Sequence, residues 1–356
     1  MPSDPPTGVR RRDLLGLMAT LPLVTQGAAP LRRGINVTHW FRYPPSADGG
    51  ALAAYLSTPA MTSLRRAGFD FVRLPVQPAV VAGDRVKALV EAIRRLQQHG
   101  FAVIVGPHPP GGGDPVGLLD FWARVAPHLA GLDRYMTIPE IVNEPVFDGD
   151  AAGWAALQTK ALHVIRASLR GRLVLLTGND WGGIDGLCGM RPADDPDTLY
   201  SFHFYEPPEL TSLAAYRPGL DRAALARLPF PTTASGCAAL DATRDAATRD
   251  VIRFLCATRW DAAAVDARIA KAAAWGARNR VPVLLGEFGA SAALNRPARL
   301  GWLAAVRAAC ERRGIGWALW GYDDMMGFGI PAAPAGTAAR PAPVLDGGVL
   351  AALGLA

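Results

Sequence analysis

The strongest constraint on the fold is a regular alternation of short apolar runs with longer helical patterns. The expected strands are residues 34–38, 71–76, 102–105, 138–145, 173–177, 199–205, 281–289 and 316–322. The expected helices are residues 51–67, 84–99, 116–129, 151–169, 241–258, 261–279, 296–313 and 345–355. Runs that are apolar throughout indicate strands buried on both faces, as in parallel sheets. Eight strands, mostly separated by helices, therefore predict one α/β domain, a (β/α)8 TIM barrel.

Polar side chains gather where such a barrel would place its chemistry, at the carboxyl ends of the strands. They are Arg73 in the second strand, His108 after the third, Asn143 and Glu144 ending the fourth, His203 and Tyr205 ending the sixth, and Glu287 ending the seventh. Trp320 ends the eighth. Each residue alone could be a satisfied core side chain. Core packing does not readily explain the whole ordered set, so we interpret these residues together as a functional site.

Two glutamates dominate this set. Glu144 and Glu287 each follow an apolar strand, and they are far apart in the sequence. Burial without a partner disfavours a charged carboxylate and raises its pKa, which suits a general acid near neutral pH. One buried glutamate is more often a salt-bridge partner. Two at strand ends indicate a paired-carboxylate site.

A series of short motifs carries a family resemblance. In order they are Arg-Gly-Ile-Asn (33–36), Gly-Phe-Asp-Phe-Val-Arg-Leu-Pro (68–75), His108, Glu-Ile-Val-Asn-Glu-Pro (140–145), His-Phe-Tyr (203–205), Gly-Glu-Phe-Gly (286–289) and Trp-Ala-Leu-Trp (317–320). This set resembles glycoside hydrolase family 5, the cellulase-like family of clan A. The resemblance implies a retaining β-glycosidase that acts on a β-glucan by double displacement, similar to an endo-β-1,4-glucanase. It implies no cofactor and no metal.

The resemblance also implies a role for each residue. Glu144 would be the acid/base and Glu287 the nucleophile. The supporting roles would be Asn143 on the sugar 2-hydroxyl, Arg73 and Tyr205 on Glu287, His203 beside Glu144, His108 on the sugar, and Trp320 as its stacking floor. Glu140 matches the family's inward-facing glutamate of the fourth strand, and we expect it to pair with Arg73.

The chain departs from the family pattern in two places. The third strand usually carries an Asp two residues before its His, and here that position is Gly106. The segment of about residues 206–260 is long for a loop, and we expect it to form a lid over the sugar groove. Further candidates for sugar contacts near the mouth are Glu206, Glu209, Asp323 and Asp324.

Composition limits the partners. The net charge is +6, but the basic residues occur in ones and twos, so we expect surface charge and no nucleic-acid face. Six dispersed histidines without a His-x-His pattern argue against a metal-dependent hydrolase. Nine tryptophans are many, and Trp40 and Trp181 lie near strand ends. Together with Trp320 they are expected to form stacking platforms in the groove.

The first 29 residues have the pattern of a signal peptide. Three arginines and Asp13 precede an apolar run, residues 14–24, that is too short to span a bilayer. The paired arginines resemble a twin-arginine signal, although an uncleaved basic helix is the alternative. The mature domain would comprise residues 30–356 and be periplasmic or secreted, most simply as a monomer without stable membrane insertion. In such a compartment Cys237 and Cys256, which flank the inserted segment, are expected to be bridged.

Several functions remain open from the sequence. The same carboxylate pair would serve a transglycosylase on β-glucan oligosaccharides, or an exo-acting β-glucosidase or β-1,3-glucanase. A non-catalytic carbohydrate-binding barrel is a different class, and the intact glutamate pair argues against it. Sugar and linkage specificity, and endo or exo action, are not determined by these motifs.

Overall fold

The computed structural model describes residues 31–109, 117–238, 240, 245–331 and 342–355. The predicted signal segment, residues 1–29, lies outside these residues, as does most of the glycine-rich stretch after the third strand. Among the helices described, none combines the length and the apolar character needed to cross a membrane.

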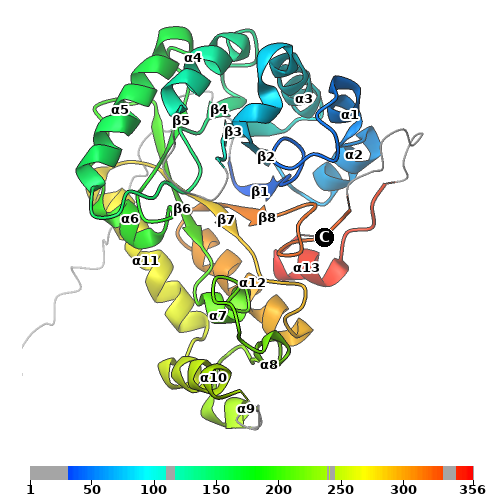
Figure 1. Ribbon diagram of the computed structural model, residues 1–356, viewed down its shortest axis with the longest axis vertical. Coiled ribbons are helices and arrows are strands. Elements are labelled where there is room, and N and C mark those ends of the chain that lie inside the picture. The colour runs from blue at the N-terminus through cyan, green and yellow to red at the C-terminus, as the bar shows by residue number, and fades with distance from the viewer. Residues whose placement is uncertain (1–30, 110–116, 239, 241–244, 332–341, 356) are drawn as a thin grey trace, which may run out of the picture.

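Eight parallel strands surround a central axis (Figure 1). They are β1 (Arg33–Asn36), β2 (Phe71–Val76), β3 (Ala102–Pro107), β4 (Thr137–Pro139), β5 (Val174–Thr177), β6 (Thr198–Phe204), β7 (Val283–Phe288) and β8 (Gly316–Trp320). Their order is β4-β3-β2-β1-β8-β7-β6-β5, and a bridge between Glu140 and Leu175 joins the two outer strands. The sheet is therefore a nearly closed barrel, and the predicted TIM barrel is confirmed.

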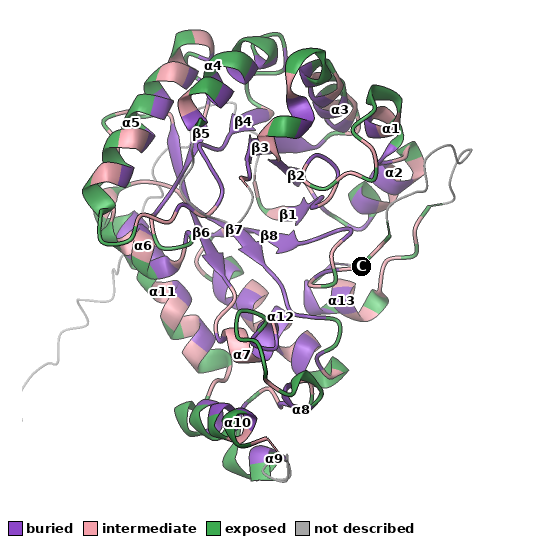
Figure 2. Cartoon of the chain, viewed as in Figure 1, coloured by how far each residue is buried: buried purple, intermediate pink, exposed green. Residues whose placement is uncertain are grey.

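Helices lie outside the strands, and all but those of residues 206–260 form a ring around the barrel (Figure 1). The helices are α1 (Gly49–Ala54), α2 (Thr58–Arg66), α3 (Val86–Gln98), α4 (Leu118–Leu129), α5 (Ala151–Ser168), α6 (Ile184–Gly189), α7 (Pro208–Thr211), α8 (Arg222–Leu225), α9 (Ala234–Ala238), α10 (Ala246–Thr258), α11 (Ala262–Asn279), α12 (Arg296–Glu311) and α13 (Gly347–Ala352). The buried sides of the ring helices face the barrel, and their exposed sides face outward (Figure 2). The predicted helix at 51–67 is two helices, because Ser57 caps α2 and Pro59 occupies its first turn.

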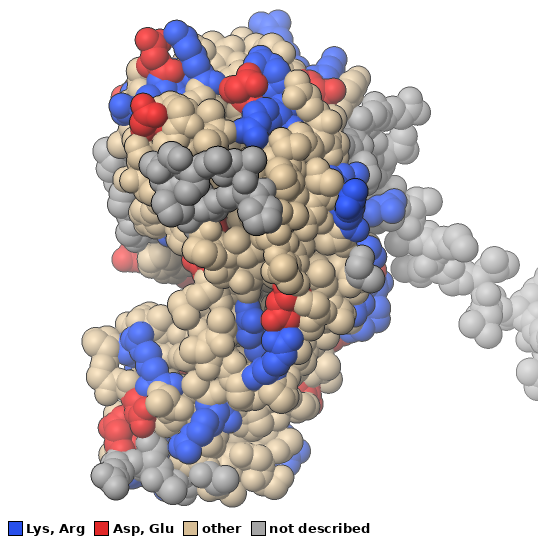
Figure 3. Space-filling view, turned by 90° about the vertical axis from the view of Figure 1, so that its right-hand side faces the viewer, with Lys and Arg blue, Asp and Glu red and all other residues tan. Residues whose placement is uncertain are grey.

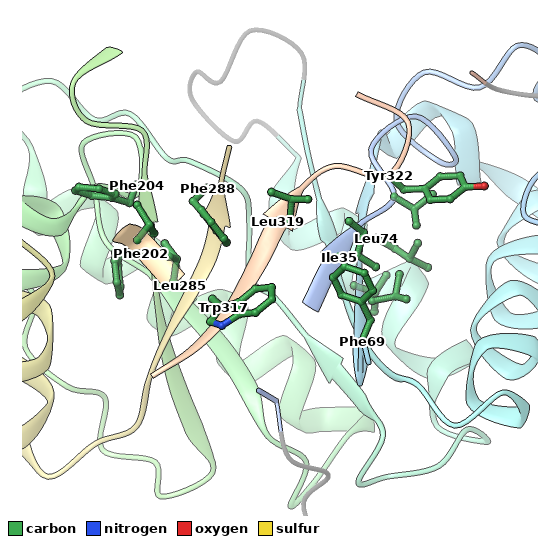
Figure 4. Close-up of a cluster of buried hydrophobic side chains, with 14 of the residues drawn as sticks. Ile35, Phe69, Leu74, Phe202, Phe204, Leu285, Phe288, Trp317, Leu319 and Tyr322 are labelled. Carbon is green, nitrogen blue, oxygen red and sulfur yellow. The ribbon is translucent and has the colours of Figure 1, made fainter. Parts of the chain in front are cut away.

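The strands separate two apolar layers, because successive side chains point to opposite sides. The larger layer packs between strands and helices and includes Ile35, Leu285 and Leu319 (Figure 4). The smaller layer fills the barrel interior, where Phe71 is its largest side chain. A Cβ on Gly34 would lie 2.2 Å from the Phe71 ring, so the floor of the barrel requires glycine there.

The interior becomes polar toward the carboxyl ends of the strands. Two residues beyond the apolar floor, on the same face of each strand, Asn36 follows Gly34, Arg73 follows Phe71, and Glu140 follows Ile138. All three polar side chains are buried. The alternation of side chains along the strands therefore places the polar site next to the apolar layer that fills the barrel interior.

The predicted insertion, residues 206–260, contains α7 to α10. Its helices α9 and α10 project beyond α12 as a separate protrusion (Figures 1 and 3). The Asn295 side chain donates to the carbonyls of Ala226 and Leu228, which anchors the insertion beside α12. In Figure 1, α9 and α10 lie to the side of the barrel and do not cross the strand ends, so this part of the insertion does not form the predicted lid. A disulfide joins Cys237 to Cys256, as predicted from the sequence.

The surface shown in Figure 3 carries basic and acidic side chains in separate small groups. Charged side chains also form pairs between helices. Asp266 accepts from both Arg312 and Arg313, and Arg296 pairs with Asp346 at 2.8 Å. The arginine-rich composition is thus used in part for surface ion pairs that join neighbouring helices.

Candidate active site

Arg73 is the centre of a buried polar network. Its Nε and NH2 groups donate to the two oxygens of Glu140, at 2.7 and 2.9 Å, which confirms the expected pair. NH1 donates to Glu287 Oε1 at 2.6 Å and to Asn36 Oδ1 at 2.9 Å. NH2 also donates to Asn143 Oδ1 at 2.8 Å. Burial by itself lowers the pKa of Arg73, but the two carboxylates raise it above its ordinary value, so the guanidinium stays charged.

Glu287 is almost fully buried near the end of β7. The pairing of β6 with β7 shifts register there, so that His203 faces Glu287 directly. Each carboxylate oxygen of Glu287 has a donor, because Arg73 reaches Oε1 and the Tyr205 hydroxyl donates to Oε2 at 2.9 Å. Burial raises the pKa of Glu287 above its ordinary value, while His203, Arg73 and the Tyr205 hydrogen bond oppose that rise. These donors hold the carboxylate in one orientation.

Glu144 lies beyond β4, where the chain has left the strand. Its φ of +29° is rare for a residue with a Cβ, and such a conformation is held only where the surroundings enforce it. Its side chain is 21% exposed, which is more open than the strand-end prediction assumed. Its Oε1 lies 2.9 Å from His203 Nδ1. The carboxylate therefore faces the solvent-accessible side of the site while one oxygen is fixed.

His203 links the two carboxylates. Its Nδ1 lies 2.9 Å from Glu144 Oε1 and 3.5 Å from Glu287 Oε2. Burial lowers the pKa of His203, but the two carboxylates outweigh it and raise the pKa above its ordinary value. Its Nε2 is buried without a hydrogen-bond partner among the described residues, so the ring's proton belongs on Nδ1. Glu144, His203 and Glu287 are also the one cluster of potential metal ligands in the described part of the chain.

His108, Asn143 and Trp320 form the next part of the site. The Asn143 amide nitrogen lies 3.5 Å from His108 Nε2. The His108 and Trp320 rings stack, with centroids 6.0 Å apart and planes inclined by 28°. Burial, with the nearby cations Arg42 and Arg73, holds the pKa of His108 well below its ordinary value, so the ring is neutral. A neutral imidazole beside an amide suits contacts with sugar hydroxyls.

The tryptophan predictions had different outcomes. Trp40 is fully buried, donates to the Leu52 carbonyl at 2.7 Å and stacks on Tyr55, so its assignment as a sugar platform is wrong. The loop after β1 turns this side chain into the helix layer. Trp181 is half exposed, and its backbone nitrogen donates to the Pro145 carbonyl at 3.2 Å. It therefore lies beside the segment that carries Glu144.

The acidic residues proposed for the mouth are largely engaged by the protein. Glu206 accepts from Arg268 through both oxygens, at 2.6 Å each. Asp323 is buried and accepts from the backbone of Thr38 and His39 and from the Tyr55 hydroxyl. The two remaining carboxylates also have partners: Glu209 accepts from Tyr216, and Asp324 accepts from the Met326 backbone. These contacts indicate that the four carboxylates have structural roles.

Two features were missed or left unexplained by the sequence. Asn36 donates to the carbonyls of Gly286 and Leu319, both at 3.1 Å, and so joins β1 to the strands on which the site is built. A Cβ on Gly106 would lie 2.5 Å from the Glu140 carbonyl oxygen. With β4 this close, the position of Gly106 has no room for a side chain, including the aspartate of the family pattern.

The fold and the site define a class of protein: a TIM barrel with paired carboxylates beyond β4 and in β7, held by this network. The chain belongs to glycosyl hydrolase family 5, because the family model described as cellulase matches residues 36–325. It is 26% identical over 344 residues to Endoglucanase 3 of Fibrobacter succinogenes, covering 86% of this chain and 51% of that protein. It is 21% identical over 318 residues to Endoglucanase C of Acetivibrio thermocellus, covering 83% and 92%.

Solved structures support the same fold. Thermotoga maritima Cel5A in complex with cellobiose superposes with a TM-score of 0.70 at 21% identity, covering 91% of this chain and 97% of that one. A structure of the same protein with mannotriose gives a TM-score of 0.70 at 20% identity, with the same shares covered. The chain spans about half the length of the Fibrobacter relative and about a quarter of Endoglucanase H of Acetivibrio thermocellus.

Proposed function

We propose that the protein is a retaining β-glycoside hydrolase that cleaves a β-1,4-linked glucan within the chain. One observation carries the proposal: an oxygen of Glu144 and an oxygen of Glu287 lie within 4.8 Å of each other. Retaining glycosidases hold their carboxyl groups about 5 Å apart, whereas inverting enzymes leave about 6.5–9.5 Å for a water molecule. This spacing supports direct attack on the sugar by one of the two carboxylates.

The contacts divide the roles between the carboxylates. Glu287 is the nucleophile, because Arg73 and Tyr205 hold its two oxygens and favour the ionised form that attacks the anomeric carbon. Glu144 is the acid/base, because it is open to solvent and contacts only His203 among these groups. In the first step Glu144 protonates the departing glycosidic oxygen while Glu287 forms the glycosyl–enzyme ester.

The second step reverses the direction of proton transfer. Glu144, now ionised, takes a proton from the incoming water, which attacks the anomeric carbon and releases Glu287. A sugar hydroxyl in place of water would give transglycosylation by the same route. Asn143 binds the sugar 2-hydroxyl through its amide nitrogen, which carries a second hydrogen besides the one facing His108, since its oxygen already accepts from Arg73.

Support for the substrate comes from the relatives and from Trp181. The relatives named above are called endoglucanases, and the Thermotoga protein has been solved with cellobiose and with mannotriose. Trp181 is exposed beside the Glu144 segment, where the leaving part of the chain must lie. An exposed indole there suits stacking against an equatorially linked sugar. A panel of β-1,4-, β-1,3- and mixed-linked glucans and mannan, with products identified, distinguishes endo from exo action.

The two roles are separable by variants. Glu287→Ala should abolish hydrolysis, and azide should restore part of it with an α-glycosyl azide product. Glu144→Ala should keep some activity on aryl glycosides whose leaving group needs no proton, and azide should then give the β-product. Glu209→Ala, which removes a glutamate bonded to Tyr216 outside the pair, is the matched control and should change neither pattern. The same azide anomer from both variants would contradict the assignment.

We also propose that the enzyme works outside the cytoplasm. The support is the sequence of residues 1–29, which combines paired arginines with a short apolar run. Fractionation of producing cells should find the activity outside the cytoplasm. Replacing the paired arginines by lysines should retain the protein inside, and unchanged export would contradict a twin-arginine route.

A further inference from the structure

Arg42 lies over the aromatic side of the site. It belongs to the loop after β1, and its guanidinium carbon is 5.3 Å from the centre of the Trp320 ring and 4.5 Å from that of Tyr43. Trp320 in turn stacks on His108, and His108 contacts Asn143. A continuous row of contacts thus runs from the catalytic network to Arg42.

Arg42 has no partner for its charge among the residues that the structure describes. Its Nε is buried and makes no hydrogen bond, a state found for no other described arginine. The arginines that are buried as whole residues are satisfied: Arg73 by carboxylates, and Arg172 and Arg299 by backbone carbonyls. A buried donor without an acceptor is costly, so an acceptor supplied by a ligand would be favoured.

The carboxylates of Asp323 and Asp324, in the loop after β8, are engaged by other groups. Asp323 is held by Thr38, His39 and Tyr55, and Asp324 Oδ1 accepts from the Met326 backbone. Asp324 Oδ2 lies 3.9 Å from His39 Nε2. Arg42 therefore presents a positive charge with unused donors at the edge of the site.

The position of Arg42 determines which end of the substrate it can contact. The leaving part of the chain lies on the Glu144 and Trp181 side, because Glu144 protonates the bond that breaks. His108, Trp320 and Arg42 are connected to the site through Asn143, which in the proposed function binds the 2-hydroxyl of the sugar that Glu287 attacks. The sugar that becomes bonded to Glu287, and the sugars on its non-reducing side, therefore lie near Arg42.

We propose that Arg42 recognises an anionic group, such as a uronate carboxylate, on the non-reducing side of the cleaved β-glucan. A guanidinium binds a carboxylate through paired, charge-assisted hydrogen bonds, and the Trp320 and Tyr43 rings hold that of Arg42 near the site. The inference rests on the proposed hydrolase function and adds substrate selectivity to it. It makes Arg42 a specificity-determining residue.

The test compares three tetrasaccharides: neutral cellotetraose, the same compound with glucuronate at the non-reducing end, and cellotetraonic acid, which carries its carboxylate at the other end. The wild-type protein should show kcat/KM about tenfold higher on the glucuronate compound than on cellotetraose, the scale of one charge-assisted hydrogen bond. Cellotetraonic acid should gain nothing. Raising NaCl from 0.05 to 0.5 M should reduce the preference, because salt screens a partly exposed pair.

Arg42→Gln should bring the ratio of the glucuronate to the neutral substrate close to one. The matched control is Arg65→Gln, which removes an equal charge stacked over Phe101 but lies in α2, and it should leave the ratio unchanged. Equal loss on both substrates would show a contact with neutral hydroxyls and overturn the inference. A kcat/KM ratio near one for the wild-type protein would also overturn the inference.

Binding measurements separate this inference from the proposed function. Calorimetry with the Glu287→Gln protein should show tighter binding of the glucuronate tetrasaccharide than of cellotetraose. If the wild-type protein hydrolyses no tetrasaccharide, the proposed function fails, while the binding difference still decides the role of Arg42. Equal binding of the two compounds overturns the anion site even if both are hydrolysed.

Discussion

Replacing Tyr205 by phenylalanine tests how the nucleophile is kept ionised. The Tyr205 hydroxyl donates to Glu287 Oε2 at 2.9 Å, and this hydrogen bond lowers the pKa of Glu287. Burial and the nearby carboxylates raise the pKa of Tyr205 itself well above its ordinary value, so the hydroxyl keeps its proton across the working range. Tyr205→Phe removes this donor and little else.

The size of the effect follows from the contact. A hydrogen bond to a charged group contributes roughly 1.5–3 kcal/mol. This free energy is lost from the ionised carboxylate and not from the protonated acid, so the loss raises the pKa of Glu287. The lower end of the energy range is expected, because Arg73 still binds the other oxygen. Glu287 must be ionised to attack, so the acidic limb of kcat/KM should move to higher pH.

The assay is the pH profile of kcat/KM for the wild-type protein and the variant on one aryl cellobioside. Tyr216→Phe is the matched control, because it removes a hydroxyl that donates to Glu209 at 2.6 Å on the surface, and its profile should not move. An acidic limb that stays in place in Tyr205→Phe, or moves to lower pH, would refute the reasoning. A uniform loss of activity at every pH would show a role in substrate positioning only.

Three further variants test other parts of the structure. Arg73→Met leaves two buried glutamates without their cation and should lower the free energy of unfolding by about 3–5 kcal/mol, measured by urea denaturation; an unchanged midpoint would contradict the network. The double replacement Cys237→Ser and Cys256→Ser removes a disulfide between cysteines separated by 19 in the sequence, and it should lower the free energy of unfolding by about 3 kcal/mol. Cys188→Ser removes a free thiol and should leave the free energy of unfolding unchanged. Trp181→Ala should lower kcat/KM on cellotetraose by about tenfold more than on a small aryl glycoside, as expected for one lost stacking contact; equal losses would place Trp181 outside the groove.

The strands could be predicted because the barrel buries both of their faces. β2 has the predicted bounds, and β7 falls within a predicted run, since continuous apolar residues bounded by turn residues leave few alternatives. The contacts of Arg73, Tyr205 and His203 with the two glutamates match those that the family resemblance implied. The position of a residue along a parallel strand determines which end of the barrel it reaches.

Other features could not be predicted, because they depend on loops. Trp40 lies only four residues after β1, yet the loop buries it, and nothing in its spacing shows in which direction the side chain points. The insertion was recognised by its length, but its anchor on Asn295 is a contact distant in sequence. Short helices such as α7, Pro208–Thr211, contain too few residues to show a period. Arg42 also lies in a loop, and its contact with the Trp320 ring brings together two residues that are far apart in the sequence.

The stereochemistry of the first product tests the central claim most directly. The account requires two displacements at the anomeric carbon, one by Glu287 and one by water activated by Glu144. NMR of the wild-type reaction on a β-linked cello-oligosaccharide, recorded before mutarotation, should show the β-anomer of the new reducing end forming first. If the α-anomer forms first, hydrolysis inverts the configuration, and Glu287 is not the nucleophile.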